Sequence, residues 1–270
     1  MQRTVTYIAL ADMLFILFLA LSGSFSGIIG GVLYYFAYII PFAILFSSSR
    51  GAFSVKKFSP GRTAEYSALY LFPFLFAVIL ISFLTSELLG LFGVSSSVDV
   101  SGNIVISLLK NALLPAVFEE LLFRLAPIAL LSVYSKKSAV LISALFFALA
   151  HGNLFQIPYA FVAGFILGIL YVVSGSIIPC ILLHFANNTL SVFMQRNPDC
   201  APLIYGTYIT VAVGAAVSLI IIFLKKERYF AEIKHLFKDK TRLSFAPGAA
   251  IYVFLTLLLS VINFISLFPR

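Results

Sequence analysis

The sequence predicts an all-α fold, a polytopic transmembrane helical bundle of about eight to nine spans. Of its 270 residues, 61% are hydrophobic and 10% are charged, whereas soluble proteins carry about 25% charged residues. The mean hydropathy is +1.08. Several charge-free runs, such as 13–49 and 138–195, reach the roughly 20 residues that cross a bilayer as a helix. The same composition excludes a soluble enzyme, a disordered chain, a collagen and a disulfide scaffold.

The first predicted helix, 5–21, is expected to stay in the mature protein. It follows a single basic residue, Arg3, and no clear cleavage site of small residues comes after it. A cleaved signal peptide is the alternative, in which Ala20, Ser22 and Ser24 would supply the small residues.

Glycine, proline, serine and clusters of charge divide the remaining hydrophobic sequence into eight further helices. These are 28–46, 66–92, 104–130, 139–153, 157–174, 176–195, 203–224 and 249–268. Gly164 and Gly168 are four residues apart, a spacing typical of helices that pack closely in membranes. We see no repeat and no soluble domain, so we predict one integral-membrane domain, 1–270.

The basic residues predict a cytoplasmic amino terminus. With alternating spans, this orientation places fourteen of the 18 Lys and Arg residues on the cytoplasmic side, which is the positive-inside pattern. They are Arg3, Arg50, Lys56, Lys57, Arg62, Lys136, Lys137, Lys225, Lys226, Arg228, Lys234, Lys238, Lys240 and Arg242. We therefore expect a multi-pass protein of the cell membrane. The net charge of +8 reflects this topology and implies no nucleic-acid partner.

The segment 225–248 is predicted to be a basic cytoplasmic loop or an interfacial helix. It interleaves Phe230, Ile233, Leu236 and Phe237 with charged residues at helical spacing. Helices of this kind lie on anionic lipid, so anionic lipid is a candidate partner.

Ionisable side chains inside the predicted spans mark the candidate site. Each costs roughly 3 kcal/mol at the bilayer centre on insertion scales, so those present are functional candidates. Asp12 stands alone in the first helix, and we expect a capped or water-exposed packing role for it. Glu87 and Lys110 fall near the outer ends of their helices, where snorkelling or a mutual ion pair explains them. The remaining residues fall at a similar depth on three helices: Glu119, Glu120, Arg124, His151, His184 and the amide Asn188. We expect these helices to converge on one polar cavity, nearer the cytoplasmic face.

Helix geometry separates the group Glu119-Glu120-x-x-x-Arg124 into two parts. Glu120 and Arg124 are four residues apart, a favourable spacing for an ion pair. Glu119 points about 100° away from Glu120, so its carboxylate stays free. Such a carboxylate can act as a general base for water.

The patterns Phe147-x-x-x-His151 and His184-x-x-x-Asn188 each place two side chains on one helix face. A single membrane histidine or asparagine often only bonds a neighbouring helix. That explanation is poor for the whole set, because every histidine within the membrane falls in one of these patterns. His184 and Asn188 can both donate hydrogen bonds, which a developing oxyanion needs in a dry site.

In this order on membrane helices, the three motifs resemble the CAAX-protease and bacteriocin-processing family, also called the Abi family, of intramembrane proteases, which includes type II CAAX prenyl endopeptidases. The resemblance covers about 113–188 and implies a catalytic core over 104–195. It implies a helical fold of about eight spans and cleavage of a peptide bond in a membrane protein or in a lipidated or hydrophobic peptide.

The resemblance also implies a role for each motif residue. Glu119 would activate water together with His151. The pair His184 and Asn188 would stabilise the tetrahedral oxyanion, while Glu120 and Arg124 would support the site. The glycine that often follows the motif arginine in the family is Leu125 here.

A glutamate mechanism without a cofactor is favoured, and a zinc metallo-endopeptidase is the alternative. If a metal is present, Glu119, His151 and His184 would hold it and leave an open position for water. However, the sequence contains no His-Glu-x-x-His motif, and two hydrogen-bond donors beside the scissile carbonyl suffice for a metal-free reaction.

Other classes of protein fit less well. An aspartyl dyad needs two membrane aspartates, and Asp12 is the only one. The Gly-Ser segments at 23–27 and 175–176 lack a partner histidine for a serine protease. A proton-coupled transporter would need polar residues along a path to both sides. A non-catalytic membrane immunity or binding protein remains the other alternative, although the intact set of reactive residue types argues against it.

Overall fold

A computed structural model describes residues 1–48, 59–91, 100, 102–238 and 246–266. Within these ranges the structure contains helices and no strand, which confirms the predicted all-α class. The helices are α1 (Gln2–Ser24), α2 (Gly27–Ser48), α3 (Pro60–Gly90), α4 (Ile104–Leu108), η1 (Leu109–Leu113), α5 (Leu114–Glu120), η2 (Leu121–Leu125), α6 (Ala126–Ser132), α7 (Lys136–Ala150), α8 (Ile157–Ser174), α9 (Ile178–Arg196), α10 (Ala201–Leu224), α11 (Lys226–Phe237) and α12 (Pro247–Ile265). All nine predicted helices are present, with the run from α4 to α6 forming the fourth.

Six of the described helices are long and apolar enough to cross a membrane, namely α1, α2, α3, α8, α10 and α12. The chain is therefore an integral membrane protein. The helices that carry the three motifs are not among these six. One of them, α7, has 15 residues, of which 10 are buried. At 1.5 Å per residue it is shorter than the roughly 30 Å of a bilayer core. The polar motifs thus lie on helices that are packed within the protein.

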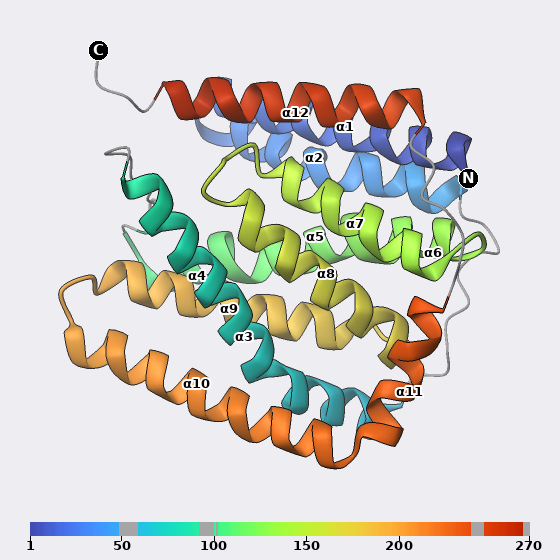
Figure 1. The fold of residues 1–270 in the computed structure, drawn as a ribbon. Coiled ribbons are helices and arrows are strands. Elements are labelled where there is room, and N and C mark those ends of the chain that lie inside the picture. The colour runs from blue at the N-terminus through green and yellow to red at the C-terminus, as the bar shows by residue number, and fades with distance from the viewer. Residues whose placement is uncertain (49–58, 92–99, 101, 239–245, 267–270) are drawn as a thin grey trace.

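Successive long helices run in opposite directions (Figure 1). The helices α1, α3, α7, α9 and α12 start at the end of the bundle marked N, which we call the amino-terminal end. The helices α2, α6, α8 and α10 finish there, and the other end is called the distal end. The starts of α1, α3 and α7 bring the basic residues Arg3, Arg62 and Lys136 to the amino-terminal end.

The fourth predicted helix is continuous but changes pitch twice. The wider π-helical turns η1 and η2 come just before α5 and α6, whose second residues are Pro115 and Pro127. A proline within a helix has no N–H and collides with the carbonyl four residues earlier, and π turns are a common accommodation. Phe123 lies four residues before Pro127, and its carbonyl accepts a hydrogen bond from the Ser143 hydroxyl of α7 instead. Each π turn therefore accommodates a proline within one long helix.

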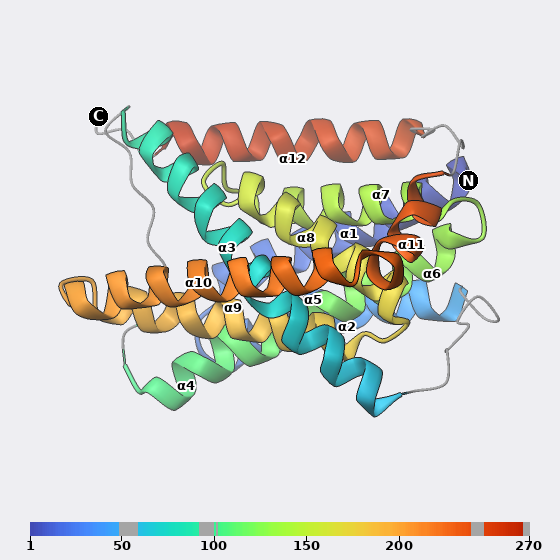
Figure 2. The same ribbon diagram turned by 60° about the horizontal axis from the view of Figure 1, so that its bottom comes forward.

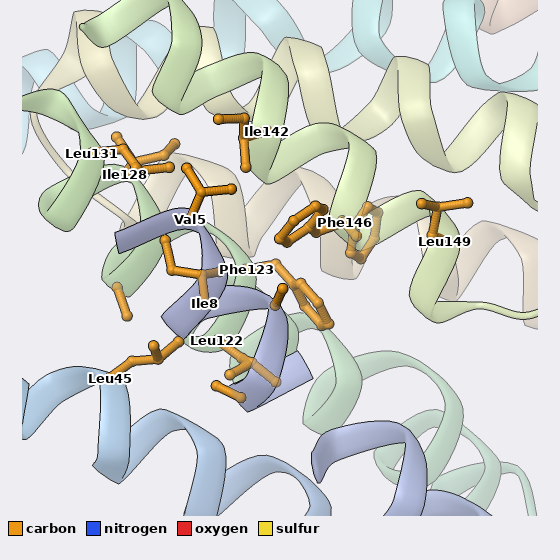
Figure 3. Close-up of a cluster of buried hydrophobic side chains, with 14 of the residues drawn as sticks. Val5, Ile8, Leu45, Leu122, Phe123, Ile128, Leu131, Ile142, Phe146 and Leu149 are labelled. Carbon is orange, nitrogen blue, oxygen red and sulfur yellow. The ribbon is translucent and has the colours of Figure 1, made fainter. Parts of the chain in front are cut away.

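Two packed cores hold the bundle together. The first joins α1, α2, η2, α6, α7 and α12, and Figure 3 shows part of it, including Val5, Leu122 and Phe146. The second joins α3, α8, α9 and α10. A close contact of α7 with α8 links them, because a Cβ on Gly164 would lie 3.0 Å from the Cα of Ala144. This confirms the close helix packing predicted from the glycine spacing.

The basic segment contains a helix, α11, which lies at the amino-terminal end of the bundle in both views (Figures 1 and 2). Tyr229 and Leu236 are buried against the bundle. Tyr229 donates a hydrogen bond to the Glu65 carboxylate of α3. Arg228 forms an ion pair with the same carboxylate at 2.7 Å. The hydrogen bond raises the pKa of Tyr229, because the carboxylate favours the protonated phenol. These apolar side chains of α11 therefore contact protein.

Asp12 differs from its prediction. Its side chain is fully buried in α1, and neither carboxylate oxygen has a hydrogen-bond partner among the described residues. The expected capped or water-exposed role is therefore wrong. Asp12 is therefore packed in the protein interior, away from water.

Candidate active site

The three motifs meet at one cavity of about 720 Å³. Glu119, His151, His184 and Asn188 all line it, as expected from the sequence. They come from α5, from the residue after α7, and from α9. Glu120 and Arg124 are fully buried and do not line the cavity. The two adjacent glutamates therefore have different surroundings.

Glu120 is the centre of a buried polar cluster behind the cavity. Nη1 of Arg124 lies 3.3 Å from Oε1 of Glu120, as the predicted ion pair requires. The same oxygen accepts a hydrogen bond from Nδ1 of His184 at 2.8 Å. The sequence did not predict this second contact, because it joins residues 64 positions apart. One carboxylate thus fixes both the arginine and the ring orientation of His184.

Glu119 faces the cavity with a side chain that is 15% exposed. Its Oε2 lies 3.8 Å from Nε2 of His184. Its Oε1 accepts a hydrogen bond from the Tyr38 hydroxyl of α2 at 3.3 Å. Sequence reasoning missed Tyr38, although Tyr34 and Tyr38 have the four-residue spacing of one helix face. The carboxylate is therefore held from one side and open from the other.

The Phe147 ring contacts Arg124 and both motif histidines. The Arg124 guanidinium carbon lies 3.7 Å from the centre of the Phe147 ring, a cation–π geometry. The rings of His151 and His184 meet the Phe147 ring at right angles, with centroids 4.8 and 5.8 Å away. A Cβ on Gly164 would lie 3.2 Å from both Arg124 and Phe147. Because Gly164 has no side chain, α8 can pack directly against Arg124 and Phe147.

His151 caps the end of α7. Its Nδ1 lies 2.8 Å from the carbonyl oxygen of Phe147. A carbonyl can only accept, so Nδ1 carries the proton, and Nε2 of the neutral ring has a lone pair. Gly152 follows with a positive φ of 58°, and its carbonyl accepts a hydrogen bond from Asn263 of α12 at 3.0 Å. The turn that carries His151 is therefore fixed by a second helix.

Asn188 can donate a hydrogen bond into the cavity. Its Oδ1 accepts a hydrogen bond from Nδ2 of Asn187 at 3.3 Å. This arrangement leaves its own Nδ2 as the donor atom. The predicted oxyanion donor therefore has suitable chemistry at the cavity wall.

The cavity lies in the distal half of the bundle. Its lining includes Ser86 near the end of α3, His151 after the end of α7, and Gln195 near the end of α9. The expectation of a site nearer the cytoplasmic face is therefore wrong for a cytoplasmic amino terminus. α7 starts at Lys136 and ends at Ala150, so His151 lies at its distal end.

The donor set does not fit a preformed metal site. Among the described residues, no group of three His, Cys, Asp or Glu side chains could hold a metal ion. Nδ1 of each motif histidine is bonded to protein, to the Phe147 carbonyl for His151 and to Glu120 for His184, so each ring offers only Nε2 to the cavity. We therefore derive no reaction step through a metal.

Residues 101–190 match the model of one protein family, described as type II CAAX prenyl endopeptidase Rce1-like. The matched part contains all six motif residues and confirms the resemblance found in the sequence. No curated protein and no solved structure matches the chain. The helices α1 to α3 and α10 to α12 lie outside the matched residues.

Proposed function

We propose that this protein is an intramembrane endopeptidase that hydrolyses a peptide bond in a membrane protein or in a lipidated or hydrophobic peptide. One observation carries the proposal: Glu119, His151, His184 and Asn188 line one cavity within the segment that matches the endopeptidase family. A carboxylate, two imidazoles and an amide supply a base and hydrogen-bond donors, which peptide hydrolysis requires.

In the proposed reaction, the Glu119 carboxylate removes a proton from a water molecule as the water oxygen bonds to the scissile carbonyl carbon. Nε2 of His151 accepts the second hydrogen of this water and orients it. When the carbon–nitrogen bond breaks, Glu119 returns its proton to the leaving amine. The reaction consumes one water and needs no further reactant.

Asn188 and His184 stabilise the tetrahedral oxyanion in this mechanism. Asn188 donates from Nδ2. His184 donates from Nε2 once its ring carries a second proton, since its Nδ1 already donates to Glu120. The contacts of Glu120 with His184 and Arg124 hold this ring in place behind the cavity.

We further propose that the amino-terminal end faces the cytoplasm of a cell membrane. Arg3, Arg62 and Lys136 support this orientation, as do the exposed Lys226 and Lys234 of α11. The exposed lysines would contact anionic headgroups. The cavity then lies toward the opposite face. A transporter is less well supported, because a relay needs polar groups on both sides and the cavity occupies one half of the bundle.

The proposal is tested with full-length protein in vesicles of phosphatidylcholine and phosphatidylglycerol. The substrates are internally quenched peptides that carry either a farnesylated cysteine or one hydrophobic helix as their anchor. We expect the wild type to cleave at least one peptide and Glu119→Gln to cleave none, with equal thermal unfolding midpoints. Absence of cleavage by the wild type, or equal cleavage by both proteins, contradicts the proposal.

A further inference from the structure

Two tyrosines of α2 connect the cavity to Glu119 from outside the matched segment. Tyr34 lines the cavity, and its hydroxyl oxygen lies 3.4 Å from that of Tyr38. Tyr38 donates in turn to Oε1 of Glu119 at 3.3 Å. Tyr38 itself is 4% exposed and does not line the cavity. Substrate in the cavity can therefore touch Tyr34 but not Tyr38.

Aromatic packing fixes the position of Tyr38. Its ring stacks on Phe118 with the centroids 5.7 Å apart. Phe15 of α1 contacts the same ring at 4.9 Å, and Tyr34 meets it edge-on at 5.5 Å. With three rings around it, the phenol has little freedom to turn away from Glu119. The hydroxyl is thus held in place before any substrate arrives.

This contact selects one orientation of the Glu119 carboxylate. With Oε1 bonded to Tyr38, Oε2 is directed toward Nε2 of His184. A glutamate side chain otherwise has several rotamers, and ordering it costs conformational entropy. A preorganised base loses less free energy on reaching the reactive geometry. The hydrogen bond from Tyr38 occupies Oε1, so Oε2 is the oxygen left to receive a proton from water.

We propose that Tyr38 is a positioning residue for Glu119, and that Tyr34 keeps the Tyr38 hydroxyl in its donor orientation. This inference rests on the proposed function for the role of Glu119. It also assigns a part of the active site to α2, which the family match does not include.

The kinetic test uses the quenched peptide that the wild type cleaves fastest. Tyr38→Phe removes one hydroxyl and keeps the ring packing. We expect it to lower kcat about tenfold to a hundredfold, as for the loss of a hydrogen bond to a charged group. KM should change less than about twofold, because Tyr38 does not reach the cavity. A purely structural role would instead lower the unfolding midpoint and leave kcat of the folded protein unchanged, which would overturn the inference.

Tyr35→Phe is the matched control. Tyr35 is on the same helix and packs on Phe118, but its hydroxyl has no hydrogen bond among the described residues, so kcat should equal that of the wild type. If Tyr38→Phe does not fold, Tyr34→Phe decides. A lower kcat with unchanged KM supports the inference, because a lost substrate contact would also raise KM, and an unchanged kcat refutes it.

A second measurement separates this inference from the proposed function. Dicyclohexylcarbodiimide modifies carboxyl groups that it can reach, and mass spectrometry locates the labelled residue. Tyr38→Phe should increase labelling of Glu119 several-fold over the wild type and Tyr35→Phe, because the Glu119 side chain loses the hydrogen bond that holds Oε1 and can turn further into the cavity. Equal labelling in all three proteins refutes the inference even if peptides are cleaved. Increased labelling without any cleavage supports the inference and refutes only the endopeptidase activity.

Discussion

His184 donates from Nδ1 to Oε1 of Glu120 across 2.8 Å, and the same oxygen lies 3.3 Å from Nη1 of Arg124. A single oxygen atom therefore joins α9 to α5 and η2 in the protein interior. If it is removed, Arg124 remains as a buried cation without its counter-charge. Such losses are among the most destabilising that a folded protein undergoes.

The first prediction separates the two adjacent glutamates. Glu120→Ala should lower the free energy of unfolding by roughly 3–5 kcal/mol and also reduce activity, because it leaves a buried charge unpaired. Glu119→Gln should keep the stability of the wild type and lose cleavage. Thermal unfolding in detergent and the peptide assay measure the two effects. A stable, inactive Glu120→Ala beside an active Glu119→Gln would reverse the assignment.

Asn188→Ala should leave a small residual activity. Loss of one oxyanion donor typically lowers kcat by about 10² to 10³. KM should stay close to that of the wild type, since the donor acts mainly on the transition state. Asn187→Ala, which removes the hydrogen bond to Oδ1 of Asn188 but keeps the Asn188 donor, should cause a smaller loss. Equal losses in the two variants would argue against a specific oxyanion role.

Ser143→Ala should destabilise the protein by about 1–3 kcal/mol. The hydroxyl of Ser143 donates a hydrogen bond to the Phe123 carbonyl. Pro127 cannot donate to this carbonyl, because proline has no N–H. Ser138→Ala is the control, because Ser138 is buried on the same helix and its hydroxyl has no partner among the described residues. The two unfolding midpoints are compared. If the variants are equally stable, the serine does not compensate for the proline.

Cleavage should persist after treatment with a chelator. Glu119 and His151 can activate water by proton transfer and hydrogen bonding, so the proposed reaction contains no metal step. The measurement is activity together with elemental analysis of purified, active protein. Stoichiometric zinc that is removed together with activity, and restored with it, would replace the glutamate mechanism by a metallo-endopeptidase.

The native cysteines report the orientation of the chain. Cys200 is exposed and lies between α9 and α10 at the distal end, while Cys180 is buried. On intact cells, a membrane-impermeant maleimide should therefore label the wild-type protein. It should not label the Cys200→Ser variant. If labelling requires cell lysis, the amino-terminal end faces outward.

Contacts between near neighbours in the sequence could be predicted, and contacts between distant residues could not. The pair Glu120 and Arg124 follows from helix geometry alone. In contrast, Tyr38 and Glu119 are 81 residues apart, and their contact depends on how α2 packs against α5. Hydrophobic periodicity predicts a helix but not its neighbours.

The sequence predicted the end of α7 three residues too late. The hydrophobic pattern predicted a helix through residue 153, which placed His151 inside it. The structure ends α7 at Ala150, and Gly152 adopts the positive φ that commonly ends a helix. The glycine was the available signal, but glycines also occur inside membrane helices.

The π turn η1 makes the two halves of one helix independently adjustable. Lys110 and Asn111, within η1, line the same cavity as Glu119. Deleting one residue from η1 would rotate everything before it by about 100° relative to Glu119. The glutamates, held by Arg124 and His184, would keep their places. Small insertions and deletions here would thus change the side chains that line the cavity while the reacting groups stay constant, a simple route for one scaffold to alter its specificity.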